Sequence, residues 1–471
     1  MKKELRLFDL TMIVVGFVIG MGIFRTPLNV AAATPTPFVF YMCWLAGGLV
    51  ALSGALTYAE IGSRLPVTGG YYKVFAYAYH PSIAFAINCI ILVSNAASLG
   101  AVALVGSEYI VGVLMPASKD AAFLSVASQA ASVRTMQMIV AIVCIIIFYF
   151  INLLGLRMSS KTQNVLMLIK IGLVLLLIAP LFFAGQAAQV PAAASVAANV
   201  SPTMMEYIKA FGVGLVAVSF TYGGYQQTIN FGEEVKNPNK NIPRGIFLAI
   251  ALIIVLYMLV NYAYVRVIGF EQLKSSKNIA AIMASHIFGP RADMVLSVLL
   301  FLGVLAYING ALLSNPRVMY AMGKDEILPR SFTQQNKNGA LTLSLSLFAG
   351  VAALVVFWAE EFDKILSFTI FLDCFGMALS AGAIFMLRKH TKHLDSKGIY
   401  KMKWYPFLPI LFIINYIFVA IAIAMDYENN DHAALTGLGV LVAFIIIYFI
   451  FYRKKEIKRN GHHAGGNETQ K

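Results

Sequence analysis

The sequence predicts an all-α membrane protein with about twelve transmembrane helices. Three observations support this prediction. The chain of 471 residues is 59% hydrophobic and only 12% charged, a composition typical of proteins embedded in a bilayer. Apolar runs long enough to cross a membrane recur almost throughout the chain. Glycines interrupt two of these runs near their middles, at 20–22 and at 223–224.

The predicted spans follow one another without a polar stretch long enough to fold separately. Residues 1–471 are therefore expected to form a single transmembrane domain. A span needs about 20 predominantly apolar residues. By that criterion the spans are 8–33, 38–62, 83–115, 135–154, 163–184, 205–231, 243–268, 292–320, 341–358, 363–387, 404–425 and 433–452.

The basic residues predict the orientation of the chain. Lys and Arg collect in short cytoplasmic loops, and with the N-terminus inside most of the 36 basic residues fall in every second loop. The acidic stretches 360–363 and 426–428 fall on the other side. We expect a multi-pass protein of the plasma membrane, surrounded by lipid, with both termini cytoplasmic. The net charge of +14 follows this topology, so no nucleic-acid partner is expected.

The glycines of the first span indicate a break in its helix. In hydrocarbon, unwound backbone survives only where it lines a cavity or is buried in protein. If the chain opens at Gly20–Gly22, the following half-helix presents free amides and a positive dipole end, which favour a carboxylate. The alternative is that Gly16 and Gly20 only allow close helix packing. This segment alone fits both interpretations.

The sixth span carries a second break, with Gly223 and Gly224 following Tyr222. In the predicted topology this helix runs antiparallel to the first. The end of its first half would expose carbonyl oxygens, which attract an ammonium group. Discontinuous helices at matching positions in two halves of a chain indicate a transporter's binding site. Together the breaks predict a site for an α-amino acid built from backbone groups.

Several motifs also resemble the amino acid/polyamine/organocation permeases, and in particular the L-type amino acid transporter branch. Residues 16–24, Gly-Phe-Val-Ile-Gly-Met-Gly-Ile-Phe, resemble the family's first-helix signature. Further matches, in the order expected for the family, lie at 58–62, 66–72, 220–225, 230–238, 242–244 and 317–325. The resemblance covers roughly residues 5 to 390.

This resemblance implies a LeuT-like fold of two inverted five-helix repeats, with broken helices 1 and 6, plus two additional helices. The first repeat would cover about 8–184, the second about 205–387, and the additional helices about 404–452. Carried over by position, the substrate-binding residues would be Ile19, Gly20, Met21, Gly22, Ile23, Phe220, Tyr222, Gly223 and Gly224.

Within that set the resemblance implies separate roles. The amides around Met21, Gly22 and Ile23 would bind the carboxylate, and carbonyls near Ile19 and Phe220 would bind the amine. Phe220 matches the aromatic residue that gates the site in the L-type branch. Many relatives have Ser or Ala where this chain has Met21, which leaves the size of the preferred substrate open.

Lys170 lies well inside the fifth predicted span and Asp373 near the middle of the tenth, where a charge costs on the order of 2.5–3.5 kcal/mol on insertion scales. Lys170 matches a lysine of sodium-independent relatives, whose ammonium lies near the first break in place of a sodium ion. We therefore expect Lys170 to brace the first half of helix 1; the alternative is that its side chain reaches to the cytoplasmic surface. Asp373 is a candidate for proton coupling, and the alternative is a water-filled pocket without a role in transport.

The loop after the sixth span carries a group of charges. Glu233, Glu234, Lys236 and Arg244 resemble an inner-gate cluster, with a solvated loop as the alternative. Eukaryotic L-type relatives can link to a single-span partner through a cysteine between helices 3 and 4. Residues 116–134 contain no cysteine, so no disulfide-linked heavy chain is expected. The oligomeric state stays open.

These observations predict a secondary active amino acid transporter that works by alternating access without sodium, as an exchanger or a proton-coupled symporter. A transporter of polyamines or other organic amines is the alternative, although no acidic pair stands at the breaks to hold a second ammonium. An amino acid sensor that does not transport is a further alternative. No enzyme is expected, because the catalytic motif His-Glu-x-x-His is missing. No metal or cofactor is expected.

Overall fold

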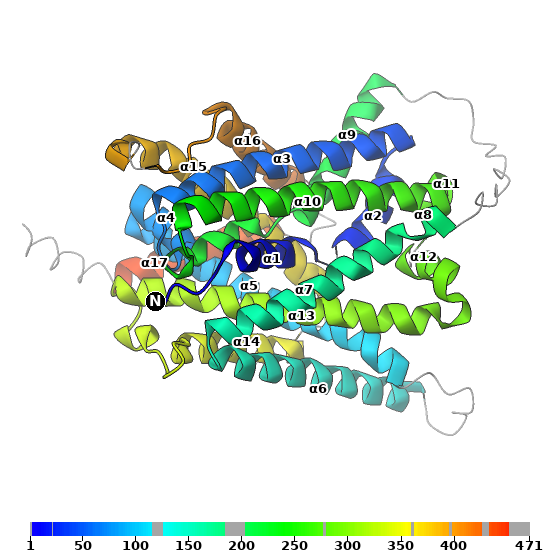
Figure 1. Cartoon of the computed structure of the whole chain (residues 1–471), viewed down its shortest axis with the longest axis horizontal. Coiled ribbons are helices and arrows are strands. Elements are labelled where there is room, and N and C mark those ends of the chain that lie inside the picture. The colour runs from blue at the N-terminus through cyan, green and yellow to red at the C-terminus, as the bar shows by residue number, and fades with distance from the viewer. Residues whose placement is uncertain are drawn as a thin grey trace, which may run out of the picture.

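The computed structural model is a bundle of long helices running roughly parallel and antiparallel to one another (Figure 1). It describes residues 2–20, 22–114, 126–183, 203–276, 279–358, 362–394, 398–425 and 433–451. Within these ranges the regular structure is α-helix and short 3-10 helix, and β-pairing is limited to isolated bridges. The prediction of an all-α protein is confirmed.

The α-helices fall into long spans and short connecting pieces. They are α1 (Leu7–Val18), α2 (Gly22–Ala33), α3 (Pro37–Arg64), α4 (Gly70–Ala78), α5 (Pro81–Leu114), α6 (Val126–Leu153), α7 (Leu156–Ile178), α8 (Pro180–Phe183), α9 (Met204–Thr221), α10 (Pro238–Val267), α11 (Phe270–Leu273), α12 (Ile279–Phe288), α13 (Ala292–Lys324), α14 (Thr342–Trp358), α15 (Phe362–His390), α16 (Phe407–Met425) and α17 (Ala433–Phe451). The 3-10 helices are η1 (Tyr225–Asn230), η2 (Gly232–Glu234), η3 (Gly289–Arg291), η4 (Arg330–Thr333) and η6 (Lys392–Leu394).

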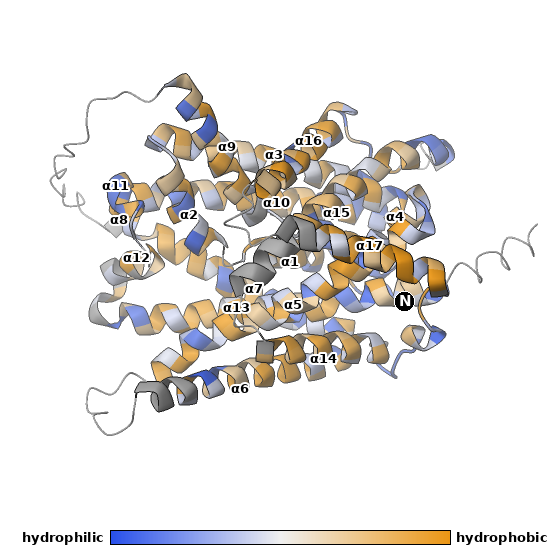
Figure 2. Ribbon diagram, turned by 180° about the vertical axis from the view of Figure 1, so that it is seen from behind, coloured by the Kyte–Doolittle hydropathy of each residue, from blue (hydrophilic) through white to orange (hydrophobic). Residues whose placement is uncertain are grey.

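Among the described residues, eight helices are long and apolar enough to cross a membrane, and a ninth span results if the bent pair α1 and α2 is counted as one. Shorter apolar helices occur within α14 and α17. Figure 2 shows hydrophobic residues along the lengths of the helices and hydrophilic ones concentrated toward the two ends of the bundle. This distribution fits a protein that crosses a bilayer several times.

The periphery of the bundle is apolar as well as its interior. On α6, Ile139, Val143, Ile147 and Phe150 are each about half exposed. Their spacing of three or four residues places them on one face of the helix. An exposed apolar face of this kind would be costly in water and is stable against lipid tails.

The centre of the bundle is occupied by α1, which packs against α7, α10, α13 and η1. Seven of its twelve residues are buried, as expected for a helix that is hydrophobic all round. Around it, α3 packs on α10, α5 on α13, and α2 on α9. The two predicted breaks, between α1 and α2 and after α9, therefore lie within protein and not against lipid.

Short helices were not predicted from the sequence. The amphipathic helix α4 follows α3, and α11 and α12 follow α10. The criterion for a span selects only long apolar runs, so it passes over pieces of four to ten residues. One of them, α12, contributes Ile279 to the central cavity described below.

Candidate functional site

The first span is broken where its glycines predict a break. Helix α1 ends at Val18, Ile19 is extended with φ −72° and ψ 90°, and α2 begins at Gly22. The two helices are bent by 44° relative to each other. Met21 lies outside the described residues, so its predicted effect on substrate size stays a prediction.

The sixth span is also interrupted at its glycines. Helix α9 ends at Thr221, and the chain resumes as the 3-10 helix η1 from Tyr225. Gly224 has φ +115°, a conformation that is costly for residues with a side chain. Phe220 is the second-last residue of α9, while its side chain lies outside the described part of the molecule.

The two breaks touch each other. A Cβ atom on Gly224 would lie 2.6 Å from the carbonyl oxygen of Phe17 in α1. A Cβ atom on Gly22 would lie 3.0 Å from the side-chain methyl of Thr221 at the end of α9. Glycine at these positions therefore allows the backbones to approach, which no larger residue does without displacement. The opened segments of α1–α2 and α9–η1 form one continuous backbone surface.

Two buried side chains bind carbonyl oxygens that the breaks release from helical hydrogen bonding. The Tyr257 hydroxyl on α10 donates to Val18 O at 3.0 Å and lies 3.4 Å from Thr221 O. The Lys170 ammonium on α7 donates to Ile19 O at 2.6 Å. With only 3% of its surface exposed, Lys170 does not reach toward the membrane surface. One hydroxyl thus links both breaks, and one ammonium holds the first.

A cavity of about 790 Å³ lies against both breaks. Its wall includes Gly20 and Gly22 from the first break, and Gly223 and Gly224 from the second. Helix α2 contributes Arg25 and Asn29 on the far side of the first break. The free amides at the start of α2 are thus within reach of a bound molecule. An anion there would also lie at the positive end of the helix dipole.

Some of the predicted binding residues line the cavity, and others have side chains that lie away from it. Besides the four glycines, both Lys170 and Asp373 line the cavity. Ile19 and Ile23 have fully buried side chains, so only their backbone groups are candidates for binding. Tyr222 is buried on the other side, where its ring packs against Trp44 and Tyr257. The structure does not bring the Tyr222 side chain to the cavity.

Other polar residues of the cavity wall were not predicted as ligands. Gln226 and Gln227 follow the second break on η1. Asn95 on α5 donates to Asn315 on α13 at 2.6 Å, and both line the cavity. In the sequence these asparagines look like residues that join helices by hydrogen bonds. Only the fold shows that the pair also faces the cavity.

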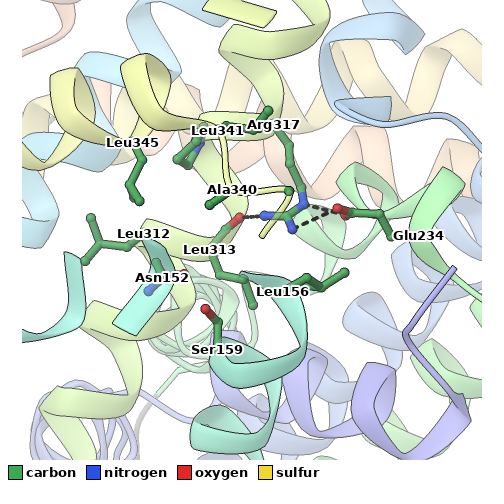
Figure 3. A pocket seen from close by; sticks show the side chains of 12 residues that line it. Asn152, Leu156, Ser159, Glu234, Leu312, Leu313, Arg317, Ala340, Leu341 and Leu345 are labelled. Atoms are coloured by element: carbon green, nitrogen blue, oxygen red, sulfur yellow. Dashed lines mark hydrogen bonds and ion pairs between the residues drawn. The ribbon is translucent and has the colours of Figure 1, made fainter. Parts of the chain in front are cut away.

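The loop after η1 closes the end of the bundle where the N-terminal residues lie, which we call the N-terminal face. The Glu234 carboxylate forms a two-point ion pair with Arg317 of α13, at 2.5 and 3.0 Å. The Arg317 guanidinium also lies 4.5 Å from the ring centre of Phe231. Figure 3 shows this pair beside a small cavity of about 30 Å³ between α6, α7, α13 and α14. The ion pair is buried and joins η2 to α13.

Of the four residues of the predicted inner gate, only the two acids are paired by the fold. Glu233 accepts a hydrogen bond from Thr68 at 3.1 Å, and Lys324 Nζ lies 3.9 Å from its carboxylate. Lys236 and Arg244 are exposed and form no ion pair with a described residue. The basic partners come from α13 and not from the loop, a long-range pairing that spacing along the chain does not reveal.

The N-terminal segment adds to this closure. The amides of Glu4 and Leu5 donate to Glu234 O at 2.9 and 3.0 Å, and Lys236 N donates to Leu5 O at 2.9 Å. A second buried cluster lies nearby. Glu60 on α3 accepts from Arg64, from Arg388 on α15 and from Met402 N, all at 2.7–2.9 Å. Backbone and ionic contacts therefore join the N-terminal segment to η2, and α3 to α15, at the N-terminal face.

Comparison with known proteins gives consistent matches along the whole chain. A family model described as amino acid permease matches residues 5–456. The serine/threonine exchanger SteT of Bacillus subtilis (strain 168) is 26% identical over 94% of this chain and 96% of its own length. The b(0,+)-type amino acid transporter 1 of Mus musculus is 25% identical over 98% and 91%. The methylthioribose transporter of Bacillus subtilis (strain 168) is 27% identical over 97% and 94%.

Proposed function

The chain belongs to the amino acid permease family and is a multi-pass membrane protein, and from this premise we propose that it exchanges amino acids across the plasma membrane without sodium. The family and the relatives named above are transporters and not enzymes. The observation that carries the proposal is the cavity of about 790 Å³ that touches both helix breaks. In this proposal the free amides of α2 bind the carboxylate of a zwitterion, and the free carbonyl oxygens at the breaks bind its amine.

In this proposal the substrate carboxylate binds the first amides of α2, from Gly22 onward. Hydrogen bonds to a charged group contribute about 1.5–3 kcal/mol each, so two or three amides suffice without an arginine. The amine binds carbonyl oxygens at the first break and at the end of α9. Ile19 O already accepts from Lys170, and a carbonyl oxygen has a second lone pair for the amine. Phe220 would gate the site.

Independence from sodium is proposed because the Lys170 ammonium occupies the first break. Its hydrogen bond to Ile19 O at 2.6 Å places a fixed positive charge beside the unwound backbone. A cation bound in the same place would meet that charge at close range, which is strongly unfavourable in a buried site. The ammonium thus supplies the stabilisation of the break that a metal cation would otherwise supply.

Alternating access is proposed because a network of charged and backbone contacts joins the elements at the N-terminal face of the bundle. Glu233 and Glu234 with Lys324 and Arg317 would form the inner gate, which opens when substrate is released to the cytoplasm. We further propose the LeuT-like arrangement of two inverted repeats, about 8–184 and about 205–387, followed by two additional helices, with both termini cytoplasmic. The close approach of the two breaks supports the inverted-repeat arrangement, because inverted repeats bring equivalent helices together at the centre.

Exchange is proposed over proton symport because SteT, which matches almost the full length, is named as an exchanger. The test is uptake of a labelled amino acid panel into liposomes containing the purified chain, with and without unlabelled substrate inside. Stimulation of uptake by internal substrate is expected. Uptake that is indifferent to internal substrate but driven by an inward proton gradient would replace exchange by symport. Uptake of methylthioribose alone would reject an amino acid substrate.

A further inference from the structure

The central cavity contains an acidic group that the backbone site for a zwitterion does not use. Asp373 lies on α15 and lines the cavity. Its side chain is partly exposed, and it forms no ion pair or hydrogen bond with any residue that the structure describes. A carboxylate in an apolar bundle is costly unless a partner compensates its charge. The partner is expected to come from a bound molecule.

The cavity wall around Asp373 is polar. Tyr307 on α13 and Tyr416 on α16 line the cavity and lie within electrostatic range of the carboxylate. Ser98 on α5 interacts with the Tyr307 hydroxyl and also lines the cavity. These hydroxyl groups offer further hydrogen bonds to a polar ligand.

The basic residues of the cavity do not compensate Asp373. Lys170 is held by Ile19 O at 2.6 Å, and Arg25 is exposed and interacts electrostatically with Glu108. Neither forms an ion pair with Asp373 in the described structure. The carboxylate therefore remains available to a cation that enters the cavity.

The first break and Asp373 share a continuous wall. Phe17, just before the break, packs on Gly310 of α13, where a Cβ atom would lie 3.1 Å from the Phe17 ring. Tyr307 precedes Gly310 by about one helical turn and lies within electrostatic range of Asp373. A substrate whose α-carboxylate and α-amine bind the breaks can thus extend its side chain along α13 toward α15.

We propose that this cavity accepts amino acids whose side chain ends in an ammonium or guanidinium group, and that Asp373 binds that group. This inference rests on the proposed function, since it assumes that the α-amino and carboxylate groups bind the two breaks. The bound zwitterion is neutral overall, so the additional positive charge of a lysine or arginine side chain balances Asp373. A neutral amino acid leaves the carboxylate without a counter-ion.

The experiment is uptake of labelled lysine, arginine, leucine and serine by the purified full chain in liposomes. Asp373→Asn keeps the shape of the side chain and removes its charge. We expect kcat/KM for lysine and arginine to fall by about 10- to 150-fold, the loss expected for one hydrogen bond to a charged group, while leucine and serine change by less than about threefold. Asp373→Glu, which keeps the charge, should retain measurable lysine uptake.

The matched control is Asp293→Asn. This substitution makes the same chemical change in the first turn of α13, where Asp293 is exposed and does not line the cavity. It should leave lysine and leucine uptake unchanged. If Asp373→Asn proves unstable, competition by unlabelled lysine against leucine uptake in the unmodified protein gives an independent answer, and strong competition supports the proposal.

Two results would overturn the inference. The first is a protein that transports neutral amino acids but neither transports lysine or arginine nor is inhibited by them. The second is an equal loss of neutral and basic substrates in Asp373→Asn, with loss of response to a proton gradient, which would make Asp373 a proton carrier. A protein that transports no amino acid at all would instead refute the proposed function.

Discussion

Replacing Lys170 with methionine tests how the first helix break is held. The Lys170 ammonium is buried and donates to Ile19 O at 2.6 Å, in the segment whose neighbouring amides are proposed to bind substrate. Methionine keeps much of the length of the side chain and removes the donor. We expect the protein to fold, because removing a charge from a membrane helix lowers the cost of inserting it by on the order of 2.5–3.5 kcal/mol.

The effect on transport follows from the lost hydrogen bond. A hydrogen bond to a charged group contributes about 1.5–3 kcal/mol. If the bond holds the break in its binding conformation, that free energy is lost from substrate affinity. Since about 1.4 kcal/mol corresponds to a tenfold change, kcat/KM for exchange should fall by roughly 10- to 150-fold.

The assay is exchange of labelled amino acid in liposomes, combined with a thermal unfolding measurement in detergent. Lys161→Met is the matched control, because Lys161 lies on the same helix and is exposed. We expect a normal or raised melting temperature together with impaired exchange in Lys170→Met only. Unchanged kcat/KM in Lys170→Met would refute the proposal that Lys170 holds the first break, and so would an equal loss in both variants.

Three further substitutions test the contacts around the site. Gly224→Ala places a Cβ atom 2.6 Å from a backbone oxygen of α1 and should abolish exchange. Gly172→Ala, whose Cβ atom would have no neighbour within 4 Å, should retain exchange. Similar activity of the two variants would contradict the close approach of the breaks. Tyr257→Phe removes the hydroxyl that binds both breaks. The apparent KM should rise by about 2- to 10-fold, because one neutral hydrogen bond contributes about 0.5–1.5 kcal/mol. A KM equal to that of the unmodified protein would argue against this link between the breaks. Glu234→Gln leaves Arg317 buried without its ion-pair partner and should lower the melting temperature. It should also increase labelling, from the cytoplasmic side, of a cysteine introduced into the cavity wall, and unchanged labelling would argue against an inner gate here.

The helix breaks were accessible to sequence reasoning because their cause is local. Glycine in an apolar helix weakens it and allows close backbone approach, so Gly20, Gly22, Gly223 and Gly224 mark the breaks without any knowledge of the fold. Lys170 was found in the same way, since a charge within an apolar run needs a compensating contact. The sequence does not reveal that the contact is Ile19 O, which requires α7 and α1 to pack side by side.

The residues missed by sequence reasoning depend on long-range packing. Arg317 lies on α13 and pairs with Glu234, 83 positions earlier in the chain. Tyr257 reads as one of many aromatic residues in an apolar helix until α10 brings its hydroxyl to Val18 O. Conversely, Tyr222 directly precedes the glycines of the second break, yet its ring packs away from the cavity because α3 and α10 enclose it. Neighbourhood along the chain therefore predicts backbone features better than side-chain direction.

The most direct test of sodium-independent exchange uses liposomes that contain the purified protein. The rate of uptake of a labelled amino acid is measured with unlabelled amino acid inside, and again with external sodium replaced by choline. We expect internal substrate to stimulate uptake several-fold and choline to leave the stimulated rate unchanged. Uptake that collapses when sodium is removed would contradict the proposal that Lys170 acts in place of sodium. Amino acid binding without any uptake would contradict the assignment of a transporter.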